Sequence, residues 1–218
     1  MDIYQEIASN VEQGYSEKTK KAVERALAEG CPPNDILHRG LITGMNAVAQ
    51  RFKSGQMFLP EVLAVAGAMK AGMTFVKPLL AGTKHSSFGK VVIGTVRGDM
   101  HDIGKNLVAI MLEGAGFEVI DLGTDVRADK FVEAVERERP AIVGMSALLT
   151  TTMLHMKGVI EALEQKNLRG DVKIIVGGAP ISNNFANEIK ADGYARDAGS
   201  AADLVRSLLN TDHHGTPL

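Results

Sequence analysis

The hydrophobic period of the chain changes near residue 85, and this change constrains the fold more than any other feature of the sequence. Before that point, apolar residues recur every three or four positions, which is the period of an amphipathic helix. After it, short runs rich in valine and isoleucine alternate with longer segments of helical period. The chain therefore contains a helical part followed by a part in which strands and helices alternate.

The helical part divides into four predicted helices. The apolar pattern places them at residues 3–13, 17–29, 34–53 and about 62–80, with short glycine-containing turns before the third and the fourth. Short turns between consecutive helices are typical of a small bundle. Residues 82–89 carry two glycines and few apolar side chains, which favours a linker. We expect a helical domain at residues 1–86 and a second domain at residues 90–212.

The second part predicts a parallel sheet. Runs rich in β-forming residues stand at 91–96, 118–121, 141–145 and 172–176, and a last strand is expected near 193–195. Because a helical stretch follows each run, the crossovers place the strands parallel and the helices on both faces. The predicted fold class is therefore α/β, a Rossmann-like doubly wound sheet after a four-helix bundle. A helix at about 200–209 and a frayed tail at 211–218 complete the chain.

Composition and charge argue against several kinds of partner. With 24 lysines and arginines against 26 aspartates and glutamates, the formal charge is −2, which argues against nucleic acid or an anionic membrane as the main partner. No uninterrupted apolar stretch approaches the ~20 residues of a transmembrane helix. A single cysteine, Cys31, allows no intramolecular disulfide, and the first residues do not resemble a secretion signal. We therefore expect a cytoplasmic protein.

Ligands of an open parallel sheet bind beyond the carboxyl ends of the strands, so the segment after the first predicted strand is of most interest. Glycines between a strand and a helix often hold phosphate. Here five residues rather than four separate Gly98 from Gly104, and Lys105 is followed by asparagine instead of serine or threonine. The two carboxylates inside the loop would also repel phosphate. The segment therefore fails as a phosphate loop.

The same segment contains a histidine beside a carboxylate. His101 has Asp99 two positions before it and Gly104 three positions after it. A histidine that ligates a metal usually donates its other ring nitrogen to a carboxylate, and Asp99 is placed to accept. Gly104 removes a side chain where the next helix begins, which leaves room for a bulky group. Since no second imidazole or thiolate stands at zinc-like spacing, the pattern fits a metal whose other positions are filled by a cofactor.

The pattern Asp-x-His-x-x-Gly is the signature of the cobalamin-binding domain, and two further motifs of that family follow it. Ser-x-Leu stands at residues 146–148, and Gly-Gly stands at residues 177–178. All three motifs occur in order, at predicted strand ends, behind a helical module. The whole chain resembles the small corrinoid proteins of methyltransferase systems that serve methylamines, methanol, methoxylated aromatics or betaines. It is also similar to the cobalamin module of methionine synthase.

The resemblance implies a site for cobalamin or another corrinoid. It makes His101 the lower axial ligand of cobalt, in place of the cofactor's own base, and Asp99 the hydrogen-bonding partner of His101. The serine of the methionine synthase pattern is Thr152 here, which keeps the hydroxyl. The other expected cofactor-binding residues lie in the histidine loop, at later strand ends beside the nucleotide tail, and on the helical cap: Gly98, Met100, Asp102, Ile103, Gly104; Ser146, Leu148, Thr150, Gly177, Gly178, Asp197, Ala198; Phe58, Val65 and Met69.

The resemblance also implies a methyl carrier in one-carbon metabolism with no substrate chemistry of its own. A substrate:corrinoid methyltransferase would load the methyl group onto Co(I), as in cob(I)alamin. A corrinoid:acceptor methyltransferase would remove it from methyl-Co(III), as in methylcob(III)alamin, and a reductive activase would rescue oxidised cobalt. Protonation of the Asp99 and His101 pair should favour release of the histidine from cobalt. An apolar cap would exclude water from the carbon–cobalt bond.

Three other functions stay open. A cobalamin-dependent sensor or regulator would need an output module, and the sequence has no basic recognition helix. The cobalamin-binding subunit of a carbon-skeleton mutase would need a substrate-binding barrel that this sequence does not contain. A flavodoxin-like or phospho-receiver domain explains the alternating pattern but leaves the three motifs as coincidence. The methyl donor, the methyl acceptor, the lower base of the corrinoid and the oligomeric state are not identified.

Several residues also have plainer interpretations. A loop histidine at position 101 could simply cap the following helix, and Phe58, Val65 and Met69 fit the core of the bundle as well as a cap. Lys105 is expected to help cap a helix or to contact cofactor amides, as is Asn106. The sequence assigns no chemistry to three acidic residues spaced like a charged loop and helix start, Asp121, Asp125 and Asp129.

Overall fold

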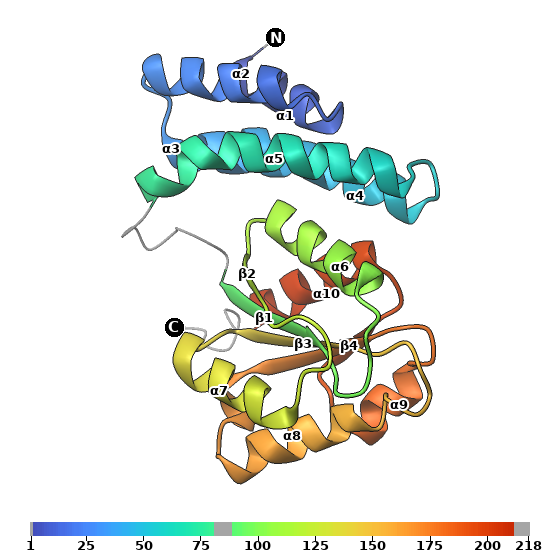
Figure 1. Cartoon of the computed structure of the whole chain (residues 1–218). Coiled ribbons are helices and arrows are strands. Elements are labelled where there is room, and N and C mark those ends of the chain that lie inside the picture. The colour runs from blue at the N-terminus through green and yellow to red at the C-terminus, as the bar shows by residue number, and fades with distance from the viewer. Residues whose placement is uncertain (1, 81–88, 212–218) are drawn as a thin grey trace. The chain divides into compact units, whose positions relative to one another are not determined.

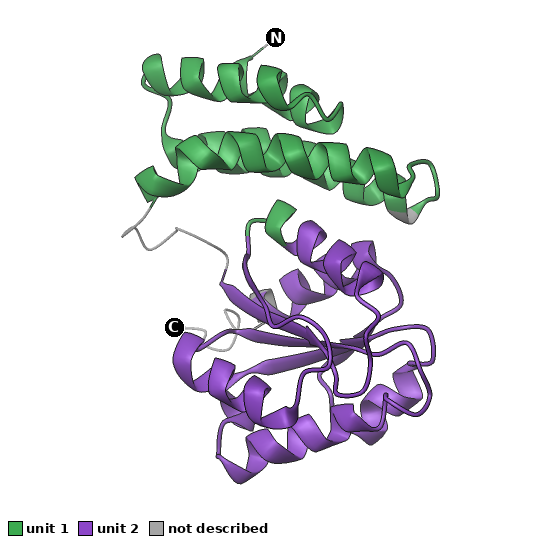
Figure 2. Ribbon diagram, viewed as in Figure 1, with its two compact units in different colours: residues 1–88, 113–116 green, residues 89–112, 117–218 purple. Residues whose placement is uncertain are grey.

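The computed structural model describes residues 2–80 and 89–211, and the chain divides into two compact units. One unit comprises residues 1–88 with 113–116, and the other comprises residues 89–112 with 117–218 (Figure 2). Most of the predicted linker and of the predicted frayed tail, residues 82–88 and 212–218, lies outside the described residues.

The helical unit contains helices at each of the positions that the apolar period indicates. Its elements are α1 (Ile3–Glu12), α2 (Ser16–Ala28), α3 (Pro33–Asp35), η1 (Ile36–Ile42), α4 (Thr43–Lys53) and α5 (Leu59–Leu80) (Figure 1). Asp2 caps α1, because its side chain accepts a hydrogen bond from the Tyr4 N–H while the Gln5 side chain binds back to the Asp2 N–H. The longest helix, α5, packs against α2 and buries one apolar side.

The segment predicted as one α-helix at 34–53 is divided in the structure. Its middle part, η1, is a π-helix, in which each N–H binds the carbonyl five residues back. Gly40 lies inside η1, and a Cβ at this position would stand 2.9 Å from Ile7 Cγ2. The wider turn therefore passes close against α1, where a side chain at residue 40 would not fit.

By length and composition alone, α5 could cross a membrane, and it is the one such helix among the described residues. The helix contains Glu61, Lys70 and Lys77. The core helix of a soluble protein passes the same test, so this is weak evidence for a membrane span.

The second unit is an α/β sheet structure, which confirms the predicted fold class. Its elements are β1 (Lys90–Thr95), α6 (Ile103–Gly114), β2 (Glu118–Asp121), α7 (Ala128–Glu138), β3 (Ile142–Ser146), α8 (His155–Gln165), η2 (Arg169–Asp171), β4 (Lys173–Gly177), α9 (Asn183–Glu188), β5 (Gly193–Ala195) and α10 (Ala198–Thr211). All strand pairs are parallel, in the order β2-β1-β3-β4-β5. Helices α6 and α10 cover one face, and α7, α8 and α9 cover the other (Figure 1).

The core of this unit lies between the central strands and the helices of both faces. Strands β1, β3 and β4 are almost wholly buried, as expected for a parallel sheet covered on both sides. Phe131 of α7 is fully buried, and its ring occupies the space beside Gly94, where a Cβ would stand 2.9 Å from the Phe131 Cζ. Apolar contacts of this kind hold the helices on the sheet.

The strand register aligns the ends of four strands. Thr95 pairs with Ser146, Ser146 pairs with Gly177, and Gly177 pairs with Ala195. The loops that leave β1, β3, β4 and β5 therefore start from one row across the sheet. This row borders the edge at which ligands of such folds bind.

Candidate functional site

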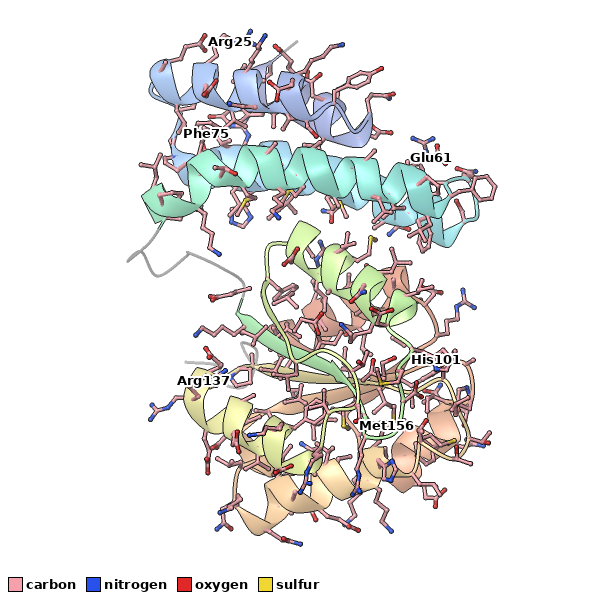
Figure 3. The ribbon with its side chains drawn as sticks, in the orientation of Figure 1. Arg25, Glu61, Phe75, His101, Arg137 and Met156 are labelled. Carbon is pink, nitrogen blue, oxygen red and sulfur yellow. The ribbon has the colours of Figure 1, made fainter. Side chains whose placement is uncertain are left out.

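The loop between β1 and α6, residues 96–102, turns back onto the end of the sheet. Thr95 is fully buried, and its hydroxyl donates a hydrogen bond to the His101 carbonyl over 2.9 Å. Gly98 has φ +77°, a left-handed conformation that glycine adopts without steric cost. As a result the Asp99 side chain is completely buried, while about half of the His101 side chain, 51%, is exposed at this edge (Figure 3).

Asp99 fixes the orientation of the His101 ring. The Asp99 Oδ1 lies 2.7 Å from the His101 Nδ1 and also accepts a hydrogen bond from the His101 backbone N–H over 3.1 Å. Since an ionised carboxylate only accepts hydrogen bonds, the Nδ1 carries the proton. The Nε2 is then the ring nitrogen that remains for a metal or a proton.

The other oxygen of Asp99 is held by the loop between β3 and α8. The Asp99 Oδ2 accepts hydrogen bonds from the Leu148 N–H and the Thr152 hydroxyl, each over 2.7 Å. Burial by itself raises the pKa of Asp99, but the hydrogen bonds from Thr152, Leu148 and His101 outweigh it and hold the pKa well below its usual range. The Asp99 carboxylate is therefore ionised, and both of its oxygens accept hydrogen bonds.

The side chains around this pair leave room for a large ligand. A Cβ built on Gly104 meets no atom within 4 Å. Large apolar side chains are exposed on the two loops and the start of α6: Met100 (70%), Ile103 (73%), Leu148 (44%), Leu149 (43%) and Leu154 (65%). Exposed apolar groups gathered near one polar site are typical of a binding surface. These features fit a wide, partly apolar group that one protein nitrogen ligates.

The two glycines after β4 are required by close backbone packing. A Cβ on Gly177 would stand 2.9 Å from the Ala195 carbonyl oxygen, and one on Gly178 would stand 1.8 Å from the Ala147 carbonyl oxygen. Gly178 also has φ +131°. Gly178 thus lets the β4–α9 loop contact the β3–α8 loop just before Leu148. Of the other predicted tail residues, Ser146 is half-buried and Thr150 is exposed on the same edge.

Asp197 and Ala198 have local structural roles. The Asp197 Oδ1 accepts a hydrogen bond from the Ser200 N–H over 2.7 Å, which caps the N-terminus of α10. Its Oδ2 accepts one from the Arg196 Nε over 3.0 Å. Ala198 is buried.

The predicted cap residues belong to the helical unit. Phe58 precedes α5 and is exposed (71%), and its N–H donates a hydrogen bond to the Glu61 Oε2 over 2.8 Å. Val65 and Met69 are buried on α5. Their contact with a cofactor stays a prediction.

Sequence reasoning missed the roles of two acidic residues. Asp121, at the end of β2, forms an ion pair with Lys105, whose side chain is only 2% exposed. The Lys105 ammonium also donates to the Asn106 side chain over 2.7 Å, so it bonds Asp121 and its own neighbour. Asp125 accepts a hydrogen bond from the Gly98 N–H over 2.6 Å. The signal for Asp121 was its place at a strand end next to the loop, whereas nothing in the sequence pattern indicated Asp125.

Within residues 2–80 and 89–211, the structure contains no group of three or more histidine, cysteine, aspartate or glutamate side chains that would hold a metal ion. Among these residues His101 therefore belongs to no such group.

Family models match both parts of the chain. A model described as a B12 binding domain matches residues 89–203, and a second model with the same description matches residues 3–77.

Similar proteins in the sequence comparison span almost the full chain. A corrinoid protein of Desulfitobacterium hafniense is 41% identical, over 96% of this chain and 98% of its own length. A trimethylamine corrinoid protein of Methanosarcina acetivorans is 43% identical over 88% and 90%, and a dimethylamine corrinoid protein of Methanosarcina barkeri is 42% identical over 95% and 98%.

Two solved structures of cobalamin-binding proteins are also similar to this chain. The methanol:cobalamin methyltransferase complex MtaBC of Methanosarcina barkeri contains a chain with a TM-score of 0.85 and 30% identity, covering 99% of this chain and 81% of that one. A cobalamin-binding protein of Desulfitobacterium hafniense has a TM-score of 0.79 and 30% identity, covering 95% and 98%.

Proposed function

This chain belongs to the B12-binding corrinoid proteins of methyltransferase systems, and from that membership we propose that it carries a methyl group between two methyltransferases on a corrinoid ligated by His101. The observation that carries this proposal is the state of His101. Its Nδ1 is bound to the buried, ionised Asp99, and its ring is half exposed among apolar side chains. A histidine in this state presents the Nε2 as a basic ligand of fixed direction.

The residues around His101 supply the rest of the proposed site. Met100, Ile103 and Leu148 would contact the apolar parts of the corrin ring, and Gly104 leaves space beside the ring. The nucleotide tail, displaced by His101, would run along the row of strand ends. Its lining would come from residues at the carboxyl ends of β3 and β4 and in the segments that follow β3, β4 and β5: Ser146, Thr150, Gly177, Gly178, Asp197 and Ala198. The proposed cap consists of Phe58, Val65 and Met69 from the helical unit.

When bound, a corrinoid would supply a cobalt centre that takes up a methyl group from one partner and gives it up to another. The protein's own contribution is to control His101. Asp99 keeps the proton on Nδ1, and Thr152 and the Leu148 N–H keep Asp99 ionised and in place. These bonds leave the Nε2 of His101 as the ring nitrogen available for ligation.

The proposed partners follow from the relatives. One solved relative is part of a methanol:cobalamin methyltransferase complex, and others are named for trimethylamine and dimethylamine. We therefore assign a substrate:corrinoid methyltransferase for a small methylated amine or alcohol as the first partner. A corrinoid:acceptor methyltransferase and a reductive activase complete the proposed cycle. The cytoplasmic location stays a prediction.

The experiment that tests this function is anaerobic reconstitution with hydroxocobalamin and with methylcobalamin, followed by gel filtration and visible spectroscopy. The wild-type protein should retain both cobalamins and show the spectrum of histidine-ligated cobalt. His101→Ala should shift the spectrum to the form without a lower nitrogen ligand, because the variant has no imidazole at this position.

The matched control is His155→Gln. His155 lies at the start of α8, and its Nδ1 donates to the Arg97 carbonyl over 2.8 Å. Glutamine keeps an N–H donor on the side chain. This variant should keep the wild-type spectrum. If neither cobalamin stays on the wild-type protein through gel filtration, the proposed function is wrong.

A further inference from the structure

We propose that Asp125 is a positioning residue for His101, because it holds the Gly98–Asp99 segment at the place where the Asp99 carboxylate reaches the imidazole. This inference rests on the proposed function for its significance, since the direction of the His101 ring matters through what it ligates. Asp125 lies in the loop between β2 and α7.

Asp125 holds this segment at both ends. Its Oδ1 accepts a hydrogen bond from the Gly98 N–H over 2.6 Å. Its own N–H donates to the Asp99 carbonyl over 3.0 Å. One residue thus binds the first N–H and the last C=O of the Gly98–Asp99 dipeptide. Two bonds to one anchor fix both the position and the direction of that dipeptide.

The anchor is itself tied to the sheet. Val126 bridges to Val96, and its N–H donates to the Thr95 carbonyl over 2.9 Å. The Thr95 N–H in turn donates to the Gly123 carbonyl over 3.0 Å. The loop of Asp125 therefore lies on the end of β1, and Asp125 transmits the position of the sheet to the histidine loop.

Asp125 adopts a conformation that most side chains avoid. Its φ is +53°, in the left-handed region that aspartate and asparagine tolerate better than other residues with a Cβ. This conformation costs free energy and persists where the surroundings hold it. Among the described residues, no cation lies within ion-pairing distance of Asp125, so the Gly98 N–H is the one partner found for its carboxylate. Both features indicate that the residue serves the histidine loop.

The histidine loop needs such an anchor. Gly98 is the residue with the greatest backbone freedom next to Asp99, and no side chain of its own restrains it. Asp99 must at the same time reach Thr152, the Leu148 N–H and the His101 ring, each over 2.7 Å. A backbone shift of about 1 Å breaks a bond of this length, because hydrogen bonds weaken steeply beyond ~3.2 Å. Asp125 prevents that shift.

The experiment compares three variants of the full chain. Asp125→Gly keeps the positive φ and removes the side-chain acceptor. Asp125→Asn keeps the acceptor and tolerates the conformation. Asn167→Gly is the matched control, since Asn167 also has a positive φ, +57°, in the turn after α8. Thermal unfolding establishes that each variant is folded, and glycine is chosen because it accepts this φ without strain.

The first measurement needs no cofactor. In ¹⁵N NMR spectra of the apo protein, Asp125→Gly should speed exchange of the Gly98 amide proton by at least about tenfold, as loss of one hydrogen bond predicts. In the same variant the His101 ring should no longer be held in one form that carries its proton on Nδ1. Asp125→Asn and Asn167→Gly should keep both wild-type signals. Unchanged Gly98 exchange and an unchanged His101 ring in Asp125→Gly would overturn the inference, as would an Asp125→Asn protein that behaves like Asp125→Gly.

The second measurement uses the protein loaded with cob(II)alamin. The EPR spectrum reports whether a histidine nitrogen ligates the cobalt. Asp125→Gly should raise the ratio of histidine-off to histidine-on protein about tenfold, the lower end of the effect of residues that support a metal ligand. A wild-type ratio in this variant would overturn the inference even though the proposed function stands. If the wild-type protein binds no cobalamin, the proposed function fails, and the NMR comparison still decides whether Asp125 positions His101.

Discussion

The helical unit and the α/β unit differ in how their buried polar side chains are bonded. In the helical unit charged side chains pair at the surface, as Arg25 does with Glu6, with 50% and 38% of the two side chains exposed. In the α/β unit Asp99, Lys105 and Thr152 are at most 5% exposed, and each has bonded partners. An exposed ion pair adds little to the free energy of unfolding, whereas a buried polar group lowers that free energy unless it is hydrogen-bonded. The buried and bonded side chains of Asp99, Lys105 and Thr152 thus lie in the unit that carries His101, whereas the buried Thr19 hydroxyl of the helical unit has no hydrogen-bond partner among the described residues.

The largest effect on this comparison is expected from Gly178→Ala. The new Cβ would stand 1.8 Å from the Ala147 carbonyl oxygen, and the residue has φ +131°. We expect the free energy of unfolding of the α/β unit to fall by about 3 kcal/mol or more, because backbone must move to relieve the overlap. Urea unfolding followed by circular dichroism measures the change.

Gly104→Ala is the control for this substitution. No atom lies within 4 Å of a Cβ at residue 104, so its effect on stability should stay within about 1 kcal/mol. If the two variants were equally stable, the backbone of the β4–α9 loop would move at little cost to make room for the new Cβ. Gly178 and Gly104 would then tolerate a side chain equally well, which would contradict the prediction.

The second effect concerns the buried ammonium of Lys105. Lys105→Met keeps the length of the side chain but leaves Asp121 without its cation. Because the Asp121 side chain is 39% exposed, water solvates the remaining carboxylate. We expect a loss of about 2 kcal/mol in urea unfolding, below the value for a fully buried pair. Lys130→Met removes an exposed partner of Glu133 and should cost much less than Lys105→Met, so similar losses in the two variants would contradict the comparison.

The third effect depends on pH and concerns Asp197. Burial raises the pKa of this carboxyl, but the hydrogen bonds from Ser200 and Arg196 outweigh it, so the pKa in the folded protein lies below its ordinary value. The stabilisation is then complete above the unfolded-state pKa, about 3.9, and is lost as the pH falls through the folded-state pKa.

Asp197→Asn keeps the helix cap and removes the charge. At pH 7 it should be less stable than the wild type by about 0.5–1 kcal/mol, because the negative charge at the N-terminus of α10 is lost. Below about pH 4 the difference should shrink. Urea unfolding at pH 7, 4 and 3 measures it, and a difference that grows at low pH would refute the assignment.

The smallest effect is expected in the helical unit. Arg25→Ala removes the exposed pairs with Glu6 and Glu29, and the free energy of unfolding should change by about 0.3 kcal/mol. Because salt screens exposed charges, the change should vanish in 1 M NaCl. A loss comparable to that of Lys105→Met would mean that the surface pairs of the helical unit are as important as the buried ones of the α/β unit.

What the sequence predicted well is encoded locally. The strand at 91–96 and the alternation of strands with helices follow from nearby side chains, and the structure confirms the α/β class. The spacing of Asp99 and His101 is also local, since both belong to one short loop. The π-helical turn at η1 escaped prediction because seven residues are too few for an apolar pattern to separate its period from that of an α-helix.

The parts of the site that the sequence did not predict depend on backbone groups and on distant residues. The Leu148 N–H binds Asp99, and a backbone donor carries no side-chain signature. The role of Asp125 depends on its backbone conformation and on contact with another loop. The pair of Lys105 and Asp121 forms because β2 lies beside β1 in the sheet, a neighbourhood that the topology sets.

The contacts of Asp99 also determine when the site forms during biosynthesis. Asp99 binds Leu148 and Thr152, which follow it by 49 and 53 residues. A nascent chain therefore exposes the histidine loop to the cell well before the ribosome has made the residues that fix it. Closing so long a segment costs entropy before any contact forms, so this part of the fold is expected to assemble late. A ligand that requires a fixed His101 must accordingly be loaded after translation has passed α8.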